Sequence, residues 1–354
     1  MDSERNVFIP LLQALKNQIY NEGNVPQYEE DRSNFMNNVA AKQSPARTQR
    51  ALSGAKKRAK RWESPLAGYL FLSPWLVGFF LLTLGPMVMS LYYSFTDYSL
   101  LAAPNWVGLE NYKKIFTSDD VFPSSLRITI TFVLCTVPLR LMFALLIAML
   151  LNRKIKGISF YRTMVYFPSL IGTSIAVSIL WKNIFSRNGF INDILGIFGI
   201  KGPSWIADPK YALGTLILLM VWQFGSSMII FLAGLKQIPT DLYEASSVDG
   251  AGKFRQFIKI TLPMLSPIIL FNAIQTMINT FQMFTQAFVI TNGGPVKSTF
   301  VYVMYLYEEA FTKFHMGYAS ALAWILLVLI GLFAAVLFGT SRYWVFYENE
   351  GGKK

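Results

Sequence analysis

The most regular feature of this sequence is the alternation of long apolar segments with short polar ones. A helix needs about 20 apolar residues to cross the hydrocarbon core of a bilayer. Six segments reach that length, and polar or charged residues bound each of them. We therefore expect an all-α integral membrane protein with about six transmembrane helices. The expected spans are approximately residues 66–94, 126–151, 160–185, 211–235, 264–290 and 318–341.

Composition supports this class. Hydrophobic residues make up 53% of the 354 residues, charged residues make up 15%, and the mean hydropathy is +0.39. These values exclude an ordinary soluble domain. Cys135 and His315 are the single cysteine and the single histidine. We therefore expect no disulfide, no metal site and no cofactor, and we expect His315 at the surface.

The positions of lysine and arginine predict how the chain is oriented across the membrane. The net charge is +12, and basic residues flank the apolar segments, which is typical of a membrane surface and argues against a nucleic-acid partner. They cluster before the first span, after the second, after the fourth and after the sixth. The positive-inside rule places these regions in the cytosol. Both termini are then expected to be cytosolic in a multi-pass membrane protein.

Three regions follow from these patterns. Residues 1–62 are expected to form a cytosolic tail that is partly disordered. Within it, residues 7–20 place their apolar side chains on one helical face, which fits an amphipathic helix or, equally well, a marginal helix in a disordered tail. Residues 63–341 form the predicted membrane domain, and residues 342–354 a cytosolic C-terminal tail.

The polar segment between the fourth and fifth spans has its own pattern. A short helix is expected to begin after Pro239, with Thr240 or Asp241 as its N-cap, and to end near Val248. Gly250 then permits a turn, and a second short helix follows. Two short amphipathic helices joined at a glycine predict a docking surface for another protein.

This segment resembles the EAA loop of permease subunits in ATP-driven importers. The family pattern reads E-A-A-x2-D-G-A-x5-F followed by L-P, and Ser246 stands where the pattern has a second alanine. Segments 71–75, 107–112 and 292–295 resemble recurring elements of carbohydrate-uptake permeases. The resemblance covers about residues 66–341 and not the tail. The matching residues of the loop are Glu244, Ala245, Asp249, Gly250, Ala251, Phe257, Leu262 and Pro263.

The resemblance implies a permease subunit of a maltose-type carbohydrate-uptake importer of the ATP-binding-cassette (ABC) class. It implies a second permease, making a heterodimer, two ATPase subunits docked on the EAA loops, an extracytoplasmic solute-binding protein and a bacterial inner membrane. The chain itself would be non-catalytic and would carry a sugar or oligosaccharide by alternating access. Within the loop, Glu244, Ala245, Asp249, Gly250, Ala251 and Phe257 would couple ATP hydrolysis to transport.

The fifth apolar segment carries a stripe of amide side chains. At about 100° per residue they fall within an arc of roughly 80° on one helical face. Amides do not face lipid without loss, so the stripe predicts either hydrogen bonds between helices or a polar path for sugar hydroxyl groups. Trp222, Phe281 and Phe284 could stack on sugar rings. The stripe consists of Asn272, Gln275, Asn279, Gln282 and Gln286.

Arg140 is a charged residue near the middle of the second apolar segment. A buried arginine at that depth costs at least about 2.5 kcal/mol and therefore needs a partner. Carbonyls at a helix end, a carboxylate of the second permease or the substrate itself could serve as that partner. A structural contact with the second permease is one interpretation. The other is that Arg140 faces the path and binds the carboxylate of an anionic sugar such as a uronate.

Two other functions need features that the residues do not supply. An ion-coupled secondary transporter of a polar solute would need acidic residues within the spans, and no acidic residue is placed convincingly there. A membrane enzyme would need a catalytic set. The acidic pair Glu308–Glu309 is interpreted as a solvated charged face in an outer segment.

Overall fold

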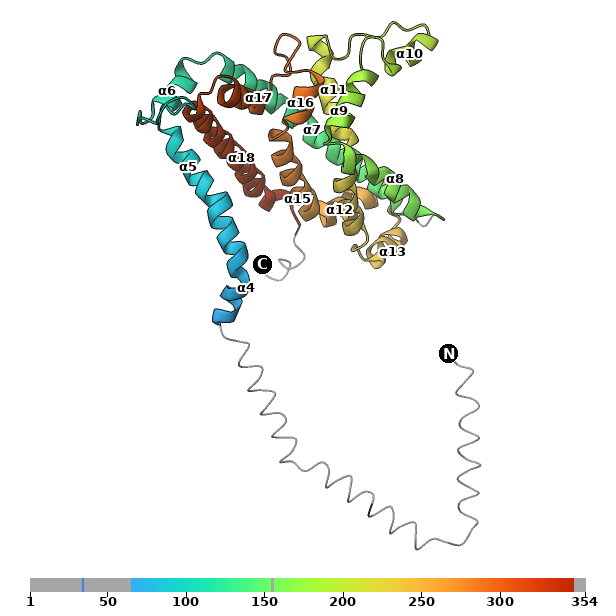
Figure 1. The fold of residues 1–354 in the computed structure, drawn as a ribbon. Helices are drawn as coiled ribbons and strands as arrows, with labels where there is room; N and C mark the ends of the chain where they lie inside the picture. Colours follow the sequence, from blue (N-terminus) through green and yellow to red (C-terminus); the bar gives the residue numbers. More distant parts are fainter. Residues whose placement is uncertain (1–33, 35–64, 154–155, 347–354) are drawn as a thin grey trace, which may run out of the picture. The chain divides into compact units, whose positions relative to one another are not determined.

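A computed structural model describes residue 34, residues 65–153 and residues 156–346 (Figure 1). The regular elements of this part of the chain are all helical. The chain divides into two compact units, residues 1–84 and 85–354. The predicted tail helix over residues 7–20 and the basic run before the first span lie outside the described residues.

In the first unit, helix α4 (Pro65–Gly78) is followed by the π-helical segment η1 (Phe79–Leu84). Pro74 lies inside α4 and cannot donate a backbone hydrogen bond to the preceding turn. Ser73 Oγ donates to the Leu70 carbonyl at 2.8 Å. The unit's described residues are almost entirely apolar, as the first predicted span requires.

The helices confirm the expected number of spans. Among the described residues, four continuous helical stretches are long and apolar enough to cross a membrane: Gly68–Ser94, Val121–Leu151, Lys253–Phe281 and Met316–Trp344. Two further pairs reach that length together but bend sharply. Ile158–Ile171 meets Ile175–Ile184 at 100°, and Pro209–Trp222 meets Gly225–Leu235 at 44°. Counting each bent pair as one span gives six.

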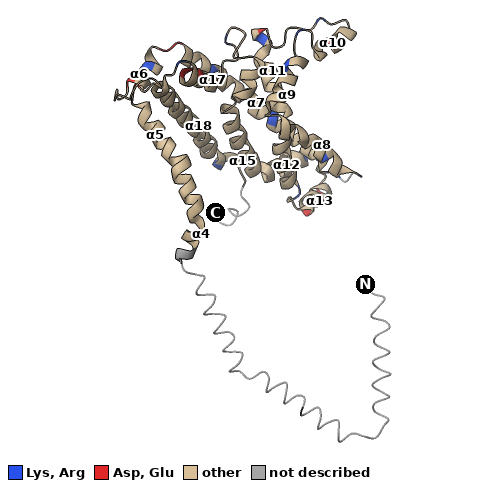
Figure 2. Ribbon diagram, viewed as in Figure 1, with Lys and Arg blue, Asp and Glu red and all other residues tan. Residues whose placement is uncertain are grey.

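In the second unit, the long helix α7 (Val121–Leu151) packs against α11 (Pro209–Trp222), α12 (Gly225–Leu235), α15 (Leu262–Phe281) and α17 (Tyr302–Tyr307). The last helix, α18 (Met316–Trp344), packs against α5 (Gly85–Ser94), α6 (Glu110–Thr117) and α15. Charged side chains lie mainly at helix ends and in connections, so the middles of the long helices are nearly free of charge (Figure 2).

The apolar core of this unit has two parts. One cluster is built around Phe132, Leu219 and Tyr302, and the other around Met228 and Leu265. Along α7, the first cluster ends at Val133 with its partner Val137, and the second begins with Leu141 and Ala144. The α11–α12 break separates the clusters as well: α11 packs in the first cluster and α12 in the second. Polar residues therefore lie between two apolar cores.

The fifth predicted span differs from the observed helix at both ends. The predicted second short helix of the polar segment is α14 (Lys253–Gln256), which continues through the π-helical η2 (Phe257–Thr261) into α15 as one helical stretch. At the other end α15 stops at Phe281, and α16 (Thr285–Ile290) is separate. The predicted boundary at residue 290 was therefore wrong.

Candidate functional site

The break between α11 and α12 lies at Gln223, within the fourth span. Its backbone carbonyl accepts hydrogen bonds from Arg140 Nη2 at 2.6 Å and from Ser169 Oγ at 3.0 Å. A carbonyl at a helix end is free to accept such bonds. The Gln223 side-chain amide donates to the Gly172 carbonyl at 3.0 Å. One residue thus joins α7, the C-terminal end of α8 (Ile158–Ile171) and the α11–α12 break.

A sharper break separates α8 from α9 (Ile175–Ile184). Ser174 caps α9, and its Oγ accepts a hydrogen bond from the Val177 backbone N–H at 3.3 Å. A methyl group added at Gly172 would overlap the Gln223 side chain and crowd the Pro168 carbonyl. Glycine is therefore needed at position 172, because the two breaks lie against each other there.

Arg140 lies on α7 and is 9% exposed. Within the described residues, the Gln223 carbonyl is the one hydrogen-bond acceptor that its side chain reaches, and Nε is buried without a partner. The ion pairs that those residues form do not include Arg140. The guanidinium group thus has no counter-ion in the described part of the chain.

Arg140 and Gln223 line a cavity of about 430 Å³. Most of the other lining side chains carry hydroxyl or amide groups. The lining comes from α8, the α8–α9 connection, α11, α12, α15 and the residues that follow α15. This volume lies within the range of small-molecule sites. The lining residues are Arg140, Ser169, Thr173, Met220, Gln223, Ser226, Asn279, Gln282, Met283, Phe284, Thr285 and Gln286.

The structure brings four of the six residues assigned to the substrate path to this cavity: Arg140, Asn279, Gln282 and Gln286. The other two lie outside its lining. Gln275 is exposed on α15, and Trp222 packs against Trp181 with ring centroids 5.7 Å apart.

The amide stripe crosses the end of α15 instead of following one helix. Gln282 is the C-cap residue of α15, and Gln286 is on α16. Asn272, at the other end of the stripe, is 2% exposed and its Nδ2 has no hydrogen-bond partner among the described residues. Asn279 and Gln282 are exposed. The stripe therefore has a buried end and an end that opens into the cavity.

The EAA loop (residues 241–263) begins on α13 (Thr240–Val248). The predicted N-cap was wrong: Pro239 occupies that position, and no side chain caps the helix. The predicted turn is confirmed, because Gly250 has a φ of +76° and the Ala251 N–H donates to the Ser246 carbonyl at 2.9 Å. This is the left-handed C-terminal geometry that glycine favours.

Ser246, the departure from the family pattern, has a structural role. Its hydroxyl donates to the Tyr243 carbonyl at 2.9 Å and accepts from Gln256 Nε2 at 3.0 Å. Gln256 thereby ties α14 to α13, and Tyr243 Oη forms a second tie to Thr261 at 2.9 Å. The serine hydroxyl therefore adds two hydrogen bonds that an alanine at position 246 would not provide. The bonds from Gln256 to the Tyr243 carbonyl and to Ser247 do not depend on it.

Several apolar side chains of this loop are exposed. Val248 is 89% exposed and Phe254 is 76% exposed, and Leu242 and Ile258 are exposed as well. Among the residues assigned to coupling, Glu244, Ala245, Asp249 and Gly250 are exposed, and Ala251 and Phe257 are half-buried. Exposed apolar groups beside charged ones are typical of an interaction surface.

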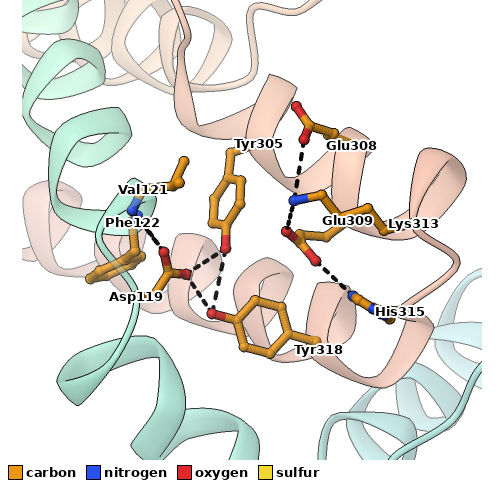
Figure 3. A network of polar contacts seen from close by, with 9 residues as sticks. All are labelled: Asp119, Val121, Phe122, Tyr305, Glu308, Glu309, Lys313, His315 and Tyr318. Atoms are coloured by element: carbon orange, nitrogen blue, oxygen red, sulfur yellow. Dashed lines mark hydrogen bonds and ion pairs between the residues drawn. The ribbon is translucent and has the colours of Figure 1, made fainter. Parts of the chain in front are cut away.

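At the other end of α7, Asp119 joins three helices (Figure 3). It accepts hydrogen bonds from the backbone N–H groups of Val121 and Phe122 at 2.8 and 3.0 Å, and from the hydroxyl groups of Tyr305 and Tyr318. Burial by itself would raise the pKa of Asp119, but these hydrogen bonds outweigh it and hold the pKa below its ordinary value. Burial and the bond to Asp119 raise the pKa of Tyr305.

Glu309 corrects one expectation from the sequence. It is 6% exposed, so it does not belong to a solvated face. Its carboxylate pairs with Lys313 Nζ at 2.7 Å and with His315 Nδ1 at 3.0 Å, as Figure 3 shows. His315 is exposed, as predicted. The hydrogen bond to Glu309 is the main reason that the pKa of Lys313 is raised.

The segment over residues 107–112, which resembles a recurring permease element, closes the end of α5. Asn111 Nδ2 donates to the carbonyl oxygens of Ser94 and Thr96 at 2.9 and 2.8 Å. Tyr112 Oη bonds to Ser94 Oγ at 2.9 Å. Asn111 thus satisfies carbonyls that the end of α5 leaves without helical partners.

Comparison with known proteins identifies the family. Residues 128–345 match the family described as binding-protein-dependent transport system inner membrane component. The probable ABC transporter permease protein YesP of Bacillus subtilis (strain 168) is 52% identical over 298 residues, covering 83% of this chain and 96% of that protein.

Two named sugar permeases are more distant. The lactose transport system permease LacF of Rhizobium radiobacter is 31% identical, covering 78% of this chain and 94% of LacF. The sulfoquinovosyl glycerol permease SmoG of Agrobacterium fabrum (strain C58) is 33% identical, covering 77% of this chain and 92% of SmoG.

The fold matches a crystal structure of a bacterial alginate ABC transporter in complex with an alginate pentasaccharide-bound periplasmic protein. The TM-score is 0.69 at 21% identity, covering 81% of this chain and 96% of that one. The chain belongs to the inner membrane components of binding-protein-dependent transport systems and is a permease subunit of an ABC importer.

Proposed function

We propose that the cavity at the α8–α9 and α11–α12 breaks lies on the translocation path of a sugar or oligosaccharide. The observation that carries this proposal is the polar lining of a cavity of about 430 Å³ between two apolar cores. Exposed amides such as Asn279 and Gln282 both donate to and accept from sugar hydroxyl groups. Phe284, which lines the cavity and packs on Phe288 and Tyr307, offers an aromatic face to a sugar ring.

The relatives support a saccharide substrate. Their names specify lactose for one protein and sulfoquinovosyl glycerol for another, so the relatives do not point to a single sugar. Gln275 and Trp222, outside this cavity, extend the proposed path along α15 and α11.

We propose that the EAA loop docks on a separate ATPase subunit. Exposed Val248 and Phe254 would enter apolar depressions of the ATPase, and Glu244 and Asp249 would form polar contacts around them. Next to them, Ser246, Asp249, Arg255, Gln256 and Lys259 line a hollow of about 250 Å³ that can receive a side chain of the ATPase. The hydrogen bonds of Gln256 make α13 and α14 move as one body, so that closure of the ATPase dimer would be transmitted to α15.

The complete assembly is proposed to contain this chain, a second and different permease, two ATPase subunits and an extracytoplasmic solute-binding protein. The chain hydrolyses no ATP itself in this proposal. The distribution of lysine and arginine supports an orientation in which the EAA loop and both termini are cytosolic. The proposed regions are a tail over residues 1–62, a membrane domain over 63–341 and a C-terminal tail over 342–354.

Reconstitution tests this function. The chain is coexpressed with the partner permease, ATPase and binding protein, purified and placed in liposomes. We expect the subunits to copurify and labelled sugar to accumulate only with ATP and binding protein. Uptake by this chain alone, driven by an ion gradient, would contradict the proposal.

A further inference from the structure

We propose that the cavity binds an anionic sugar and that Arg140 is the residue that binds its carboxylate. The inference rests on the proposed function, because it assigns a substrate class to the same cavity. It starts from a charged side chain that is nine-tenths buried, lines the cavity and has no counter-ion among the described residues.

Burial of this charge is costly, and the surroundings shown by the structure offset only part of the cost. A guanidinium group carries five N–H donors in a fixed plane. One N–H of Nη2 is bound by the Gln223 carbonyl, and Nε has no acceptor among the described residues. The other polar lining groups are neutral amides and hydroxyls. A carboxylate entering the cavity would supply the missing charge and a bidentate acceptor.

The Gln223 carbonyl also fixes the position of the arginine. With Nη2 held at 2.6 Å, the side chain is oriented before a ligand arrives, so less rotamer entropy is lost on binding. Neutral donors and acceptors such as Asn279 and Gln282 line the same cavity and suit the hydroxyl groups of the same sugar. The lining thus offers one cationic group for a carboxylate and several neutral groups for hydroxyls.

A carboxylate of the partner permease is the competing counter-ion. It would neutralise Arg140 within the assembly and leave the cavity to neutral sugars. The two alternatives predict different behaviour of the same variants. Loss of a subunit contact weakens assembly, whereas loss of a ligand contact leaves assembly intact and changes the preference between sugars.

The test uses the whole transporter with Arg140→Gln and Arg140→Lys. Arg162→Gln is the matched control, because Arg162 Nη2 also donates to a carbonyl, that of Leu151 at 2.8 Å, and its Nε is likewise buried without a partner. Arg162 does not line the cavity. The probes are labelled 4-linked galacturonate disaccharide and its carboxyl-reduced galactose counterpart, which differ only at the carboxylates.

We expect wild type to take up the uronate in preference to the reduced sugar. Arg140→Gln should lower uronate uptake about tenfold or more and lower uptake of the reduced sugar much less, with the subunits still copurifying. Arg140→Lys should restore part of the uronate uptake, and Arg162→Gln should leave the preference unchanged.

Equal loss for both sugars, dissociation of the complex, preference for the reduced sugar, or uptake of neither probe by a transporter with binding-protein-stimulated ATP hydrolysis would overturn the inference and leave the proposed function standing. Absence of that ATP hydrolysis in the wild-type assembly would overturn the proposed function as well.

Discussion

Arg140 on α7 donates a hydrogen bond of 2.6 Å to the backbone carbonyl of Gln223, at the point where α11 ends. This bond ties the longest of the described helices to a break in the fourth span. Gln223 in turn contacts the second break through Gly172. The two breaks and the arginine therefore form one polar junction between two apolar cores.

The close approach at this junction predicts that Gly172→Ala destabilises the chain. The added methyl group would overlap the Gln223 side chain and crowd the Pro168 carbonyl. We expect a loss of about 1–3 kcal/mol, measured as a lower unfolding temperature of the purified complex. Gly214→Ala is the control, because a methyl group there meets no atom within 4 Å.

The double variant Gly172→Ala/Gln223→Ala separates the two overlaps. Removing the longer side chain should recover part of the stability, and the Pro168 carbonyl should account for the remainder. If the double variant is no more stable than the sum of the single effects predicts, the side-chain overlap is not the cause.

The turn of the EAA loop predicts that Gly250→Val abolishes transport while the chain still inserts into the membrane. Gly250 has a φ of +76°, and no atom lies within 4 Å of an added methyl group, so the penalty is conformational. A left-handed backbone costs roughly 1–2 kcal/mol for a residue with a Cβ, and a β-branched residue is disfavoured further. ATPase copurification and sugar uptake measure the effect.

Gly250→Asn is the matched variant, since asparagine tolerates this conformation. It should keep most of the ATPase binding and uptake. Normal uptake by Gly250→Val, or equal loss in both variants, would show that the turn conformation is not what coupling requires.

Substitutions of the amide residues are predicted to affect sugar uptake and subunit assembly differently. Asn279→Ala, Gln282→Ala and Gln275→Ala should lower sugar uptake without changing subunit copurification. Asn272→Ala should instead affect stability, because Asn272 is 2% exposed and lies outside the cavity lining. Dissociation of the complex by the first three, with normal uptake by the complexes that survive, would favour hydrogen bonding between helices.

The spans and Arg140 could be predicted from the sequence, whereas the two helix breaks could not. Apolar length indicated the spans, and a charge inside an apolar segment identified Arg140. The breaks were missed, because Gly172 and Gln223 are single residues in segments that remain apolar on average. The run Gln223–Phe–Gly–Ser–Ser227 was a usable signal, since four of its five residues are polar or glycine.

Contacts between residues far apart in the sequence could not be predicted. Asp119 bonds to Tyr305 and Tyr318, 186 and 199 residues away. A single sequence contains no pattern that pairs an aspartate before one helix with tyrosines on two later helices. The burial of Glu309 was missed for the same reason, because its burial depends on packing and not on the local Glu308–Glu309 pattern.

The network around Asp119 predicts a pH-dependent contribution to stability. Its pKa is lowered below the ordinary value of 3.8, so the contribution is present above that pH and is lost as the pH falls through the lower folded-state value. Tyr305→Phe removes the hydrogen bond to Asp119 and the longer one to Tyr318 Oη at 3.4 Å, and should cost about 1 kcal/mol.

Unfolding temperatures at neutral pH and near pH 3 check this prediction. The difference between wild type and Asp119→Asn should shrink at acid pH. A difference that stays constant with pH would show that the ionised form of Asp119 has no special role in stability.

The measurement that tests the translocation path most directly uses the chain's single cysteine. The experiment uses a Cys135→Ser background. Asn279→Cys is placed in the cavity. Leu134→Cys is the control, because Leu134 is 58% exposed within the apolar span Val121–Leu151, where a charged reagent does not enter. A charged, membrane-impermeant thiol reagent is applied to the reconstituted transporter, and modification and sugar uptake are followed together. We predict modification of Asn279→Cys that blocks ATP-dependent uptake and is slowed by sugar-loaded binding protein, with Leu134→Cys unmodified. Normal uptake after complete modification at position 279, or no modification there during active transport, would contradict the assignment of the cavity to the sugar path.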